Sequence, residues 1–381
     1  MKSIKRRSFL KAAPAGLLLL AGCGGKSESA SSEAVAVPLE IESEYRLDYA
    51  QQFSAVRYTN GCTLLTIADS DDKFFIVPDG VSVQDVPEGA TVLQQPVDNI
   101  YLVSSSVMDI FCSLDALDSI KFSGTQADGW YLSEAKQAME DGRISYAGKY
   151  SAPDYEQILA ADCGLAIENT MIYHTPEVKE ELERFGIPVL VERSSYEDGP
   201  LARMEWIKCY GLILGLEQQA EQIFNEKVEQ IQPVIEQEPT GKTAAFFSIT
   251  SNNLATVRKG KDYVAQMIEM AGGTYVFASL TDSGNNLATV NLPLETFYAQ
   301  AHDADVLIYN GTIEGEIETT AQLVAKCSML ADFKAVQSGD VWCTNKNLFQ
   351  HSMEMTDFIT DLNAVFTGDD TYEMRFIAKL S

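Results

Sequence analysis

The stretch that decides the fold is Pro153-Asp-Tyr-Glu156-Gln-Ile-Leu-Ala-Ala-Asp162-Cys-Gly-Leu-Ala-Ile-Glu-Asn169, because the second half of the chain repeats its pattern in Pro293–Asn310. In both copies a Pro is followed by a Glu, a helical segment, an Asp, a buried strand and an Asn. A repeated helix and strand in each half favours two lobes built alike, each of the strand-helix-strand kind.

The rest of the chain fits two α/β lobes behind a β-rich segment. Beyond residue 95, short apolar runs alternate with helical stretches, which is typical of α/β layering. Residues 45 to 95 instead alternate short strands with turn residues. The predicted strands are Phe53–Tyr58, Cys62–Ile67, Phe74–Val77, Ile100–Val103, Leu165–Ile167, Pro188–Val191, Thr243–Phe247, Val306–Tyr309 and Val341–Trp342.

A helical stretch separates the two groups of strands. It runs from about Pro200 to Gln237, breaks at Gly215 and ends at Pro239-Thr-Gly241. Its second part carries an apolar stripe at helical spacing, and twenty helical residues span about 30 Å. We therefore expect an N-terminal lobe over residues 45–199, connecting helices over 200–238 and a C-terminal lobe over 239–381, with two Rossmann-like lobes joined once.

The N-terminus, MKSIKRRSFLKAAPAGLLLLAGC, indicates export and lipid attachment. Arg6-Arg7-Ser8-Phe9-Leu10-Lys11 matches the twin-arginine export pattern, and Leu20-Ala21-Gly22-Cys23 matches the lipobox of bacterial lipoproteins. The apolar run between them is too short to span a bilayer as a mature helix. These features predict a signal peptide over residues 1–22, a lipid on Cys23 and a lipidated tether over residues 23–44. The protein would then face the outside, or the periplasm, and touch the membrane only through its lipid.

Charge and cysteine content narrow the function classes. The net charge is −27, and the first 22 residues hold five Lys or Arg and no acid, so the remainder carries −32. Such a surface repels nucleic acid. Seven cysteines occur without a Cys-x-x-Cys pair, which argues against a zinc-ribbon or thioredoxin-like site. Export would permit disulfides, and the sequence leaves open whether any form.

In this order of features the chain resembles the class III solute-binding proteins of ABC importers for ferric siderophores, haem and cobalamin. The resemblance rests on the lipobox, the two Glu-bearing segments, the connecting helix and Met267-Ile-Glu-Met-Ala-Gly-Gly273. A narrower resemblance, to a lipoprotein branch of anaerobic bacteria, is carried by Ala147–Glu156, Ile187–Tyr196 and Arg203–Lys208. The resemblance to the solute-binding family implies that the protein is a monomer without an intrinsic cofactor, and that it works with an ABC permease and its ATPase.

The resemblance also implies residue roles. In that family each lobe presents a surface Glu to an Arg pocket of the permease, and by position these are Glu156 and Glu295. Either Glu could instead simply complement a helix N-terminus. Ligands of this fold lie between the lobes, against loops at strand ends. The predicted ligand-binding residues are Lys149, Tyr150, Arg193, Ser195, Tyr196, Ser248, Asn252, Asn253, Arg258, Trp342, Asn345 and Phe349.

The expected ligand is a ferric siderophore, because Arg side chains pair with anionic oxygens and aromatic rings lie flat on chelates. Cobalamin and haem remain alternatives. A bare zinc or manganese ion is a weaker fit, since the only histidines are His174, His302 and His351, although one could be an axial ligand. An exported enzyme is the rival of another class, but the chain lacks GxSxG, HExxH, Walker and GxGxxG motifs. Arg203, Trp130 and Trp206 are expected to be structural.

Overall fold

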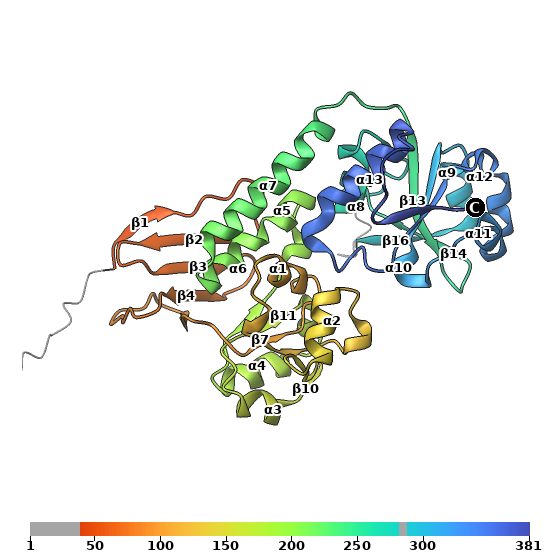
Figure 1. Ribbon diagram of the computed structural model, residues 1–381. Helices are drawn as coiled ribbons and strands as arrows, with labels where there is room; N and C mark the ends of the chain where they lie inside the picture. Colours follow the sequence, from red (N-terminus) through yellow and green to blue (C-terminus); the bar gives the residue numbers. More distant parts are fainter. Residues whose placement is uncertain (1–38, 282–287) are drawn as a thin grey trace, which may run out of the picture. The chain divides into compact units, whose positions relative to one another are not determined.

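The computed structural model describes residues 39–281 and 288–381. The predicted signal peptide, the lipobox and Cys23 lie outside the described residues. Within those residues the chain has the predicted mixed α/β fold, with parallel sheets at the centre of both lobes (Figure 1). In this part of the chain no helix is both long enough and apolar enough to cross a membrane.

The β-rich segment forms a five-stranded sheet in the order β1-β2-β3-β4-β5. Neighbouring strands are antiparallel, except that β4 and β5 are parallel. In β2 and β3 buried residues alternate with more exposed ones, as expected for a sheet with one buried face. The strands are β1 (Ile41–Glu44), β2 (Phe53–Tyr58), β3 (Thr63–Ile67), β4 (Lys73–Val77) and β5 (Ala90–Gln94).

The N-terminal lobe holds an all-parallel sheet in the order β12-β11-β6-β7-β8. Three of its five strands, β6, β11 and β12, are continuous buried runs that end in a polar residue or a loop, as expected for a parallel sheet covered on both faces. The elements are β6 (Ile100–Leu102), α1 (Met108–Ser113), β7 (Ile120–Ser123), α2 (Ser133–Glu140), β8 (Ser145–Tyr146), β9 (Gly148–Lys149), β10 (Ala152–Pro153), α3 (Tyr155–Ala160), β11 (Ala166–Glu168), α4 (Pro176–Arg184) and β12 (Val189–Val191).

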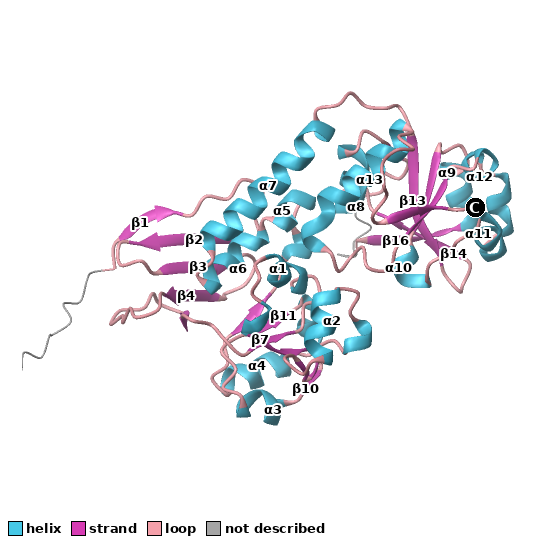
Figure 2. Ribbon diagram, viewed as in Figure 1, coloured by secondary structure: helices cyan, strands magenta, loops and turns pink. Residues whose placement is uncertain are grey.

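Three helices follow: α5 (Pro200–Met204), α6 (Trp206–Leu214) and α7 (Glu217–Ile235). Gly215 caps α6 in the left-handed conformation, with φ 73°, which produces the break expected from the sequence. The stripe on α7 buries Ala220, Phe224 and Ile231. Helix α7 packs against α6 and against α13 (Met355–Thr367), so it contacts elements from both halves of the chain (Figures 1 and 2).

The C-terminal lobe holds a mixed sheet in the order β16-β14-β13-β17-β18-β19, with β15 paired to β13. Strands β13, β17 and β18 are parallel, whereas β14, β16 and β19 add antiparallel edges that the sequence analysis did not predict. The elements are β13 (Thr243–Ile249), β14 (Leu254–Arg258), α8 (Tyr263–Met270), β15 (Thr274–Tyr275), β16 (Thr289–Pro293), α9 (Leu294–Ala301), β17 (Val306–Tyr309), α10 (Gly311–Glu314), α11 (Thr320–Lys326), α12 (Lys334–Ser338), β18 (Val341–Thr344) and β19 (Ile377–Lys379).

Two buried carboxylates attach the five-stranded β1–β5 sheet, which we call the N-terminal sheet, to the connecting helices. They bind the segment that leads into β2. Glu205 accepts hydrogen bonds from the backbone N–H groups of residues 48, 49 and 50 at 2.7–2.9 Å, and Lys208 pairs with it at 2.8 Å. Glu197 likewise accepts from residues 51 and 52 and from Nε1 of Trp206. Trp206 and Trp130 are both buried, which confirms that they are packing residues.

Candidate functional site

The loops that leave the strand ends of the two lobes meet at Gln350–Met353, which we call the junction segment. It follows β18 of the C-terminal lobe. The side-chain amide of Gln350 donates to the carbonyl of Gly129 and accepts from the N–H of Tyr131, both at 2.8 Å. Gly129 and Tyr131 belong to the loop after β7, in the other lobe.

The end of the junction segment makes two more bonds to the N-terminal lobe. Ser352 Oγ donates to the carbonyl of Ser106 at 2.6 Å, and the N–H of Met353 donates to Asp109 at 2.7 Å. Asp109 is buried, and burial raises the pKa of its carboxyl to about 6. The lobes are therefore bridged at the carboxyl ends of parallel strands, the place at which open α/β folds hold ligands.

Beside the junction segment lie two arginines and two aromatic rings, Arg203, Arg258, Tyr263 and Phe349, which we call the arginine pocket. The Cζ atom of Arg203 is 4.1 Å from the ring centroid of Tyr263. The Cζ atom of Arg258 is 5.9 Å from the same centroid and 4.8 Å from that of Phe349. Ser352 of the junction segment also lines this pocket. Both guanidinium groups are thus held by cation–π contacts.

The arginine pocket carries a surplus of positive charge. Within the described residues, the ion pair recorded for Arg258 is with Asp262, whose oxygen lies 3.6 Å away, and Nε of Arg203 is buried without a hydrogen-bond partner. Among the described residues, Asp262 is the carboxylate placed beside both guanidinium groups, so this cluster favours a further anion. A cavity of about 10 Å³, lined by Arg203, Tyr263, Phe349 and apolar side chains but not by Arg258, has room for about one water molecule. Entry of a larger anionic group therefore requires the Phe349 ring or the junction segment to move.

Of the predicted ligand-binding residues, the structure brings Arg258 and Phe349 into contact. It places Arg193 elsewhere: this side chain is buried, and its guanidinium donates to Gln52 and pairs with Asp69 at 3.0 Å. Because Gln52 directly precedes β2 and Asp69 follows β3, Arg193 fastens the end of the β1–β5 sheet to the lobe. Tyr196 stacks on Arg193 at 4.7 Å, and Ser195 is exposed beside it.

The remaining predicted contacts are scattered. Ser248 is buried within β13, while Asn252 and Asn253 are exposed in the hairpin at the far end of β14 from Arg258. Trp342 lies inside β18 under Lys379, and Asn345 donates to the carbonyl of Arg375. Lys149 is exposed on β9, and Tyr150 packs against the core of the N-terminal lobe. For these residues a role in ligand binding stays a prediction.

The two glutamates expected to dock the permease are both exposed. Glu156 lies in the first turn of α3, where Asp154 caps the helix by accepting from the N–H of Gln157. Glu295 lies in the first turn of α9, which begins without a side-chain cap. Since Asp154 already caps α3, Glu156 is not needed to satisfy those backbone donors.

The three histidines lie apart. His174 is exposed, His302 is 3.2 Å from Asp303, and Nδ1 of His351 lies 2.8 Å from Glu354. The contact with Glu354 raises the pKa of His351, although burial opposes it. No group of three or more His, Cys, Asp or Glu residues suited to a metal ion occurs within residues 39–281 and 288–381. The six cysteines described are unpaired.

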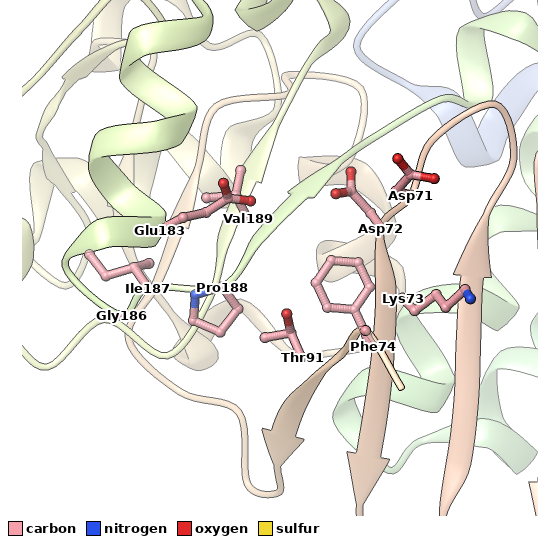
Figure 3. A pocket seen from close by; sticks show the side chains of 11 residues that line it. Asp71, Asp72, Lys73, Phe74, Thr91, Glu183, Gly186, Ile187, Pro188 and Val189 are labelled. Atoms are coloured by element: carbon pink, nitrogen blue, oxygen red, sulfur yellow. The ribbon is translucent and has the colours of Figure 1, made fainter. Parts of the chain in front are cut away.

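A separate cavity of about 340 Å³ lies between the N-terminal sheet and the end of α4 (Figure 3). Phe74, Thr91 and Pro188 line it together with the carboxylates of Asp72 and Glu183. Lys179 pairs with both carboxylates, at 3.0 and 2.6 Å. Because Lys179 already pairs with both carboxylates, we regard the cavity as part of the seam between the β1–β5 sheet and the N-terminal lobe.

Sequence reasoning missed one buried acid altogether. Glu168, the last residue of β11, has no exposed surface, and neither carboxylate oxygen has a hydrogen-bond partner among the described residues. Burial alone raises the pKa of its carboxyl to about 8. The segment Leu165–Glu168 is typical of a buried strand with a polar end, and no pattern in it indicates that the carboxyl group itself is fully buried.

Comparison with known proteins identifies the fold. No family model matches the sequence. A protein of Methanocaldococcus jannaschii named as an uncharacterized lipoprotein is 24% identical over 288 residues, 72% of this chain and 66% of that protein. The chain thus spans a little less than two thirds of that relative.

Solved structures with similar folds include three binding proteins. The periplasmic haem-binding protein HutB of Vibrio cholerae has a TM-score of 0.56 and 18% identity, over 70% of this chain and 98% of that one. The vitamin B12-binding protein BtuF of Vibrio cholerae has a TM-score of 0.52 and 13% identity, over 73% of this chain and 99% of that one. FepB, a TroA-like periplasmic binding protein of Veillonella parvula, has a TM-score of 0.56 and 13% identity, over 75% of this chain and 96% of that one. The chain therefore has the two-lobed fold of class III periplasmic solute-binding proteins, as the sequence predicted.

Proposed function

We propose that this protein is the exported binding component of an ABC importer, and that it captures a metal chelate and delivers it to the permease. The fold supports this proposal, since the similar structures are described as binding proteins for iron, haem and vitamin B12 rather than as enzymes. Such a protein needs no catalytic residues. It needs a ligand site between lobes, a surface that the permease can bind, and attachment outside the cell.

The observation that carries the ligand proposal is the arginine pocket. Within the part of the chain that the structure describes, the guanidinium groups of Arg203 and Arg258 lie against aromatic rings beside the junction between the lobes, with Asp262 as their nearby carboxylate. Ferric siderophores carry catecholate, carboxylate or hydroxamate oxygens around the metal, and Arg pairs well with such anionic oxygens. We therefore favour a ferric siderophore with anionic groups. Although similar folds bind haem and vitamin B12, His351 is already paired with Glu354 and is poorly placed as an axial ligand.

Removing either arginine is expected to weaken chelate binding, and for Arg203 this proposal replaces the structural role expected from the sequence. In Arg203→Gln and Arg258→Gln the loss of one charge-assisted contact predicts a dissociation constant higher by about tenfold or more. The measurement is an equilibrium titration with the iron(III) complex of 2,3-dihydroxybenzoate, with haemin and with cyanocobalamin as comparison ligands. Arg184→Gln, which removes an exposed arginine of α4, is the matched control. If the wild type binds haemin or cyanocobalamin and both pocket variants bind it equally well, the anionic siderophore is the wrong ligand.

Lipid attachment gives a second prediction. Cys23→Ser removes the thiol that would accept the lipid, so the protein should appear in the soluble fraction or accumulate as precursor. Membrane fractionation and mass spectrometry of the N-terminal peptide measure this. A separate variant carries Arg6→Lys and Arg7→Lys together. This change should block export through the twin-arginine route. Membrane retention of the Ser variant, with no lipid on the wild-type peptide, would contradict the lipoprotein proposal.

A further inference from the structure

The junction segment covers a buried carboxyl group of the N-terminal lobe. Asp109 lies in α1 and accepts the backbone N–H of Met353 at 2.7 Å. Ser352 and Met353 are both buried, and Ser352 Oγ donates to the carbonyl of Ser106 beside α1. The segment that bridges the two lobes therefore also keeps water from Asp109, and movement of the segment would expose this carboxyl group.

Charged side chains from several elements face Asp109. His351 of the junction segment lies 2.8 Å from Glu354, which directly follows that segment. Lys227 of α7 pairs with Asp357 of α13 at 3.1 Å. The charges of His351 and Lys227 favour the ionised form of Asp109, whereas the carboxylate of Glu354 opposes it.

Two other titratable neighbours keep a single charge state. Burial raises the pKa of Glu354, but the contact with His351 outweighs burial and lowers it from its ordinary value of 4.5. On α1 itself, burial raises the pKa of the Cys112 thiol to about 12, with smaller contributions from Asp109 and from Glu134 of α2. Between pH 5 and pH 8, therefore, neither Glu354 nor Cys112 changes its charge.

Asp109 and His351 hold protons more firmly while the junction is closed. Burial raises the pKa of Asp109 from 3.8 to about 6, although the hydrogen bond from Met353 and the charge of His351 oppose it. Burial lowers the pKa of His351, as does the charge of Arg375, but the contact with Glu354 and the charge of Asp109 outweigh both and raise it above 6.5. A raised pKa means that proton uptake stabilises the closed junction. This contribution is lost as the pH rises through the two raised pKa values.

We propose that the junction segment is a proton-dependent latch between the lobes, which closes on α1 while Asp109 and His351 hold their protons and opens more often as they lose them. The segment bridges the lobes, covers a buried acid and carries the histidine of the same cluster. The lobes are then held together more firmly in acidic surroundings than in alkaline ones. Because the same movement would admit a larger anionic group to the arginine pocket, access to that pocket should rise with pH. This last consequence rests on the proposed function, whereas the latch does not.

Hydrogen exchange of the Met353 amide in the full-length protein measures how often the junction opens. The measured quantity is the protection factor, the exchange rate of an unstructured peptide divided by the observed rate at the same pH, which removes the pH dependence of exchange itself. If the pKa of Asp109 returns to 3.8 on opening, ionisation of Asp109 alone lowers this protection by about tenfold between pH 5 and pH 8. Deprotonation of His351 adds to the fall.

Variants assign the pH dependence to this cluster. Asp109→Asn keeps an oxygen that can accept the Met353 N–H but cannot ionise, so most of the fall in protection should disappear. The fall should disappear fully when His351→Gln is added. Asp118→Asn, which neutralises an exposed aspartate that follows α1, is the matched control and should behave like the wild type. Thermal unfolding checks that each variant is folded, and Asp109→Asn decides alone if the double variant is not.

Two results would overturn the latch. One is a protection factor at Met353 that stays constant in the wild type, or that falls equally in Asp109→Asn. The other is equal protection of Met353 and of the buried strand β13 at every pH, because the junction would then open only when the whole protein unfolds. Both results are obtained without a ligand, so failure of the latch is distinguishable from failure of the proposed function.

Discussion

Uptake of the chelate by whole cells is expected to stop when Glu156 and Glu295 are both changed to Ala. Both carboxylates are exposed, and each lies in the first turn of a helix, one in each of the two lobes. We propose that each binds a separate arginine-lined recess on the permease, so that the importer recognises both lobes at once. A buried guanidinium left without its carboxylate costs several kcal/mol, and loss of both contacts should therefore prevent productive docking.

The uptake experiment needs a binding measurement beside it. Neither glutamate need touch the ligand, so the double variant should bind the chelate within about threefold of the wild type. Glu180→Ala with Glu269→Ala is a matched control, because it removes one exposed glutamate from another helix of each lobe. The control should transport normally. Unchanged uptake by the Glu156 and Glu295 double variant would contradict the docking proposal, whatever its ligand affinity.

Stability should fall as the pH rises, and Glu168 should account for much of the fall. Burial raises the pKa of its carboxyl from 4.5 to about 8, so the folded protein holds this proton more firmly than the unfolded chain. The contribution is complete below pH 4.5 and is lost as the pH rises to about 8. One pKa unit corresponds to about 1.4 kcal/mol, so the full loss is about 5 kcal/mol.

Urea unfolding between pH 5 and pH 9 measures this effect. Glu168→Gln cannot ionise, so its free energy of unfolding should fall by about 4 kcal/mol less than that of the wild type over this range. We compare how steeply the free energy of unfolding changes with pH, and not its absolute value. The buried amide of Gln has unpaired polar groups of its own, which lower the stability at every pH. Glu180→Gln, at an exposed position, should follow the wild type. Parallel curves for Glu168→Gln and the wild type would show that Glu168 does not carry an elevated pKa.

The fold could be predicted from the sequence because its signals are local. Apolar runs such as Val306–Tyr309 form buried strands, and the stripe that ends at Ile231 and Val234 marks α7. The antiparallel strands β14 and β16 were missed for the opposite reason. Both are short, only partly buried and hold polar residues within the run, so no strong periodicity marks them.

The site could be predicted only in part, because its contacts join residues far apart in the chain. Arg258 and Phe349 were both expected at strand ends, and they do meet. Arg193 was expected for the same reason, but its partner is Asp69 in the turn after β3, and no pattern relates those two positions. Gln350 and Tyr131 carry no signal of their own. Their importance comes from a hydrogen bond between the lobes, which appears only when the chain is folded.

The central claim, that the protein binds a metal chelate, is tested most directly by titrating the apo protein and following its tryptophan fluorescence. The ligands are iron(III) 2,3-dihydroxybenzoate, haemin, cyanocobalamin, and Zn²⁺ and Mn²⁺ as bare ions. We expect the ferric chelate to bind with a micromolar or lower dissociation constant, equivalent to about −8 kcal/mol or better, and the bare ions to bind far more weakly. Binding of a bare ion in this range, with none of the three chelates bound, would contradict the claim.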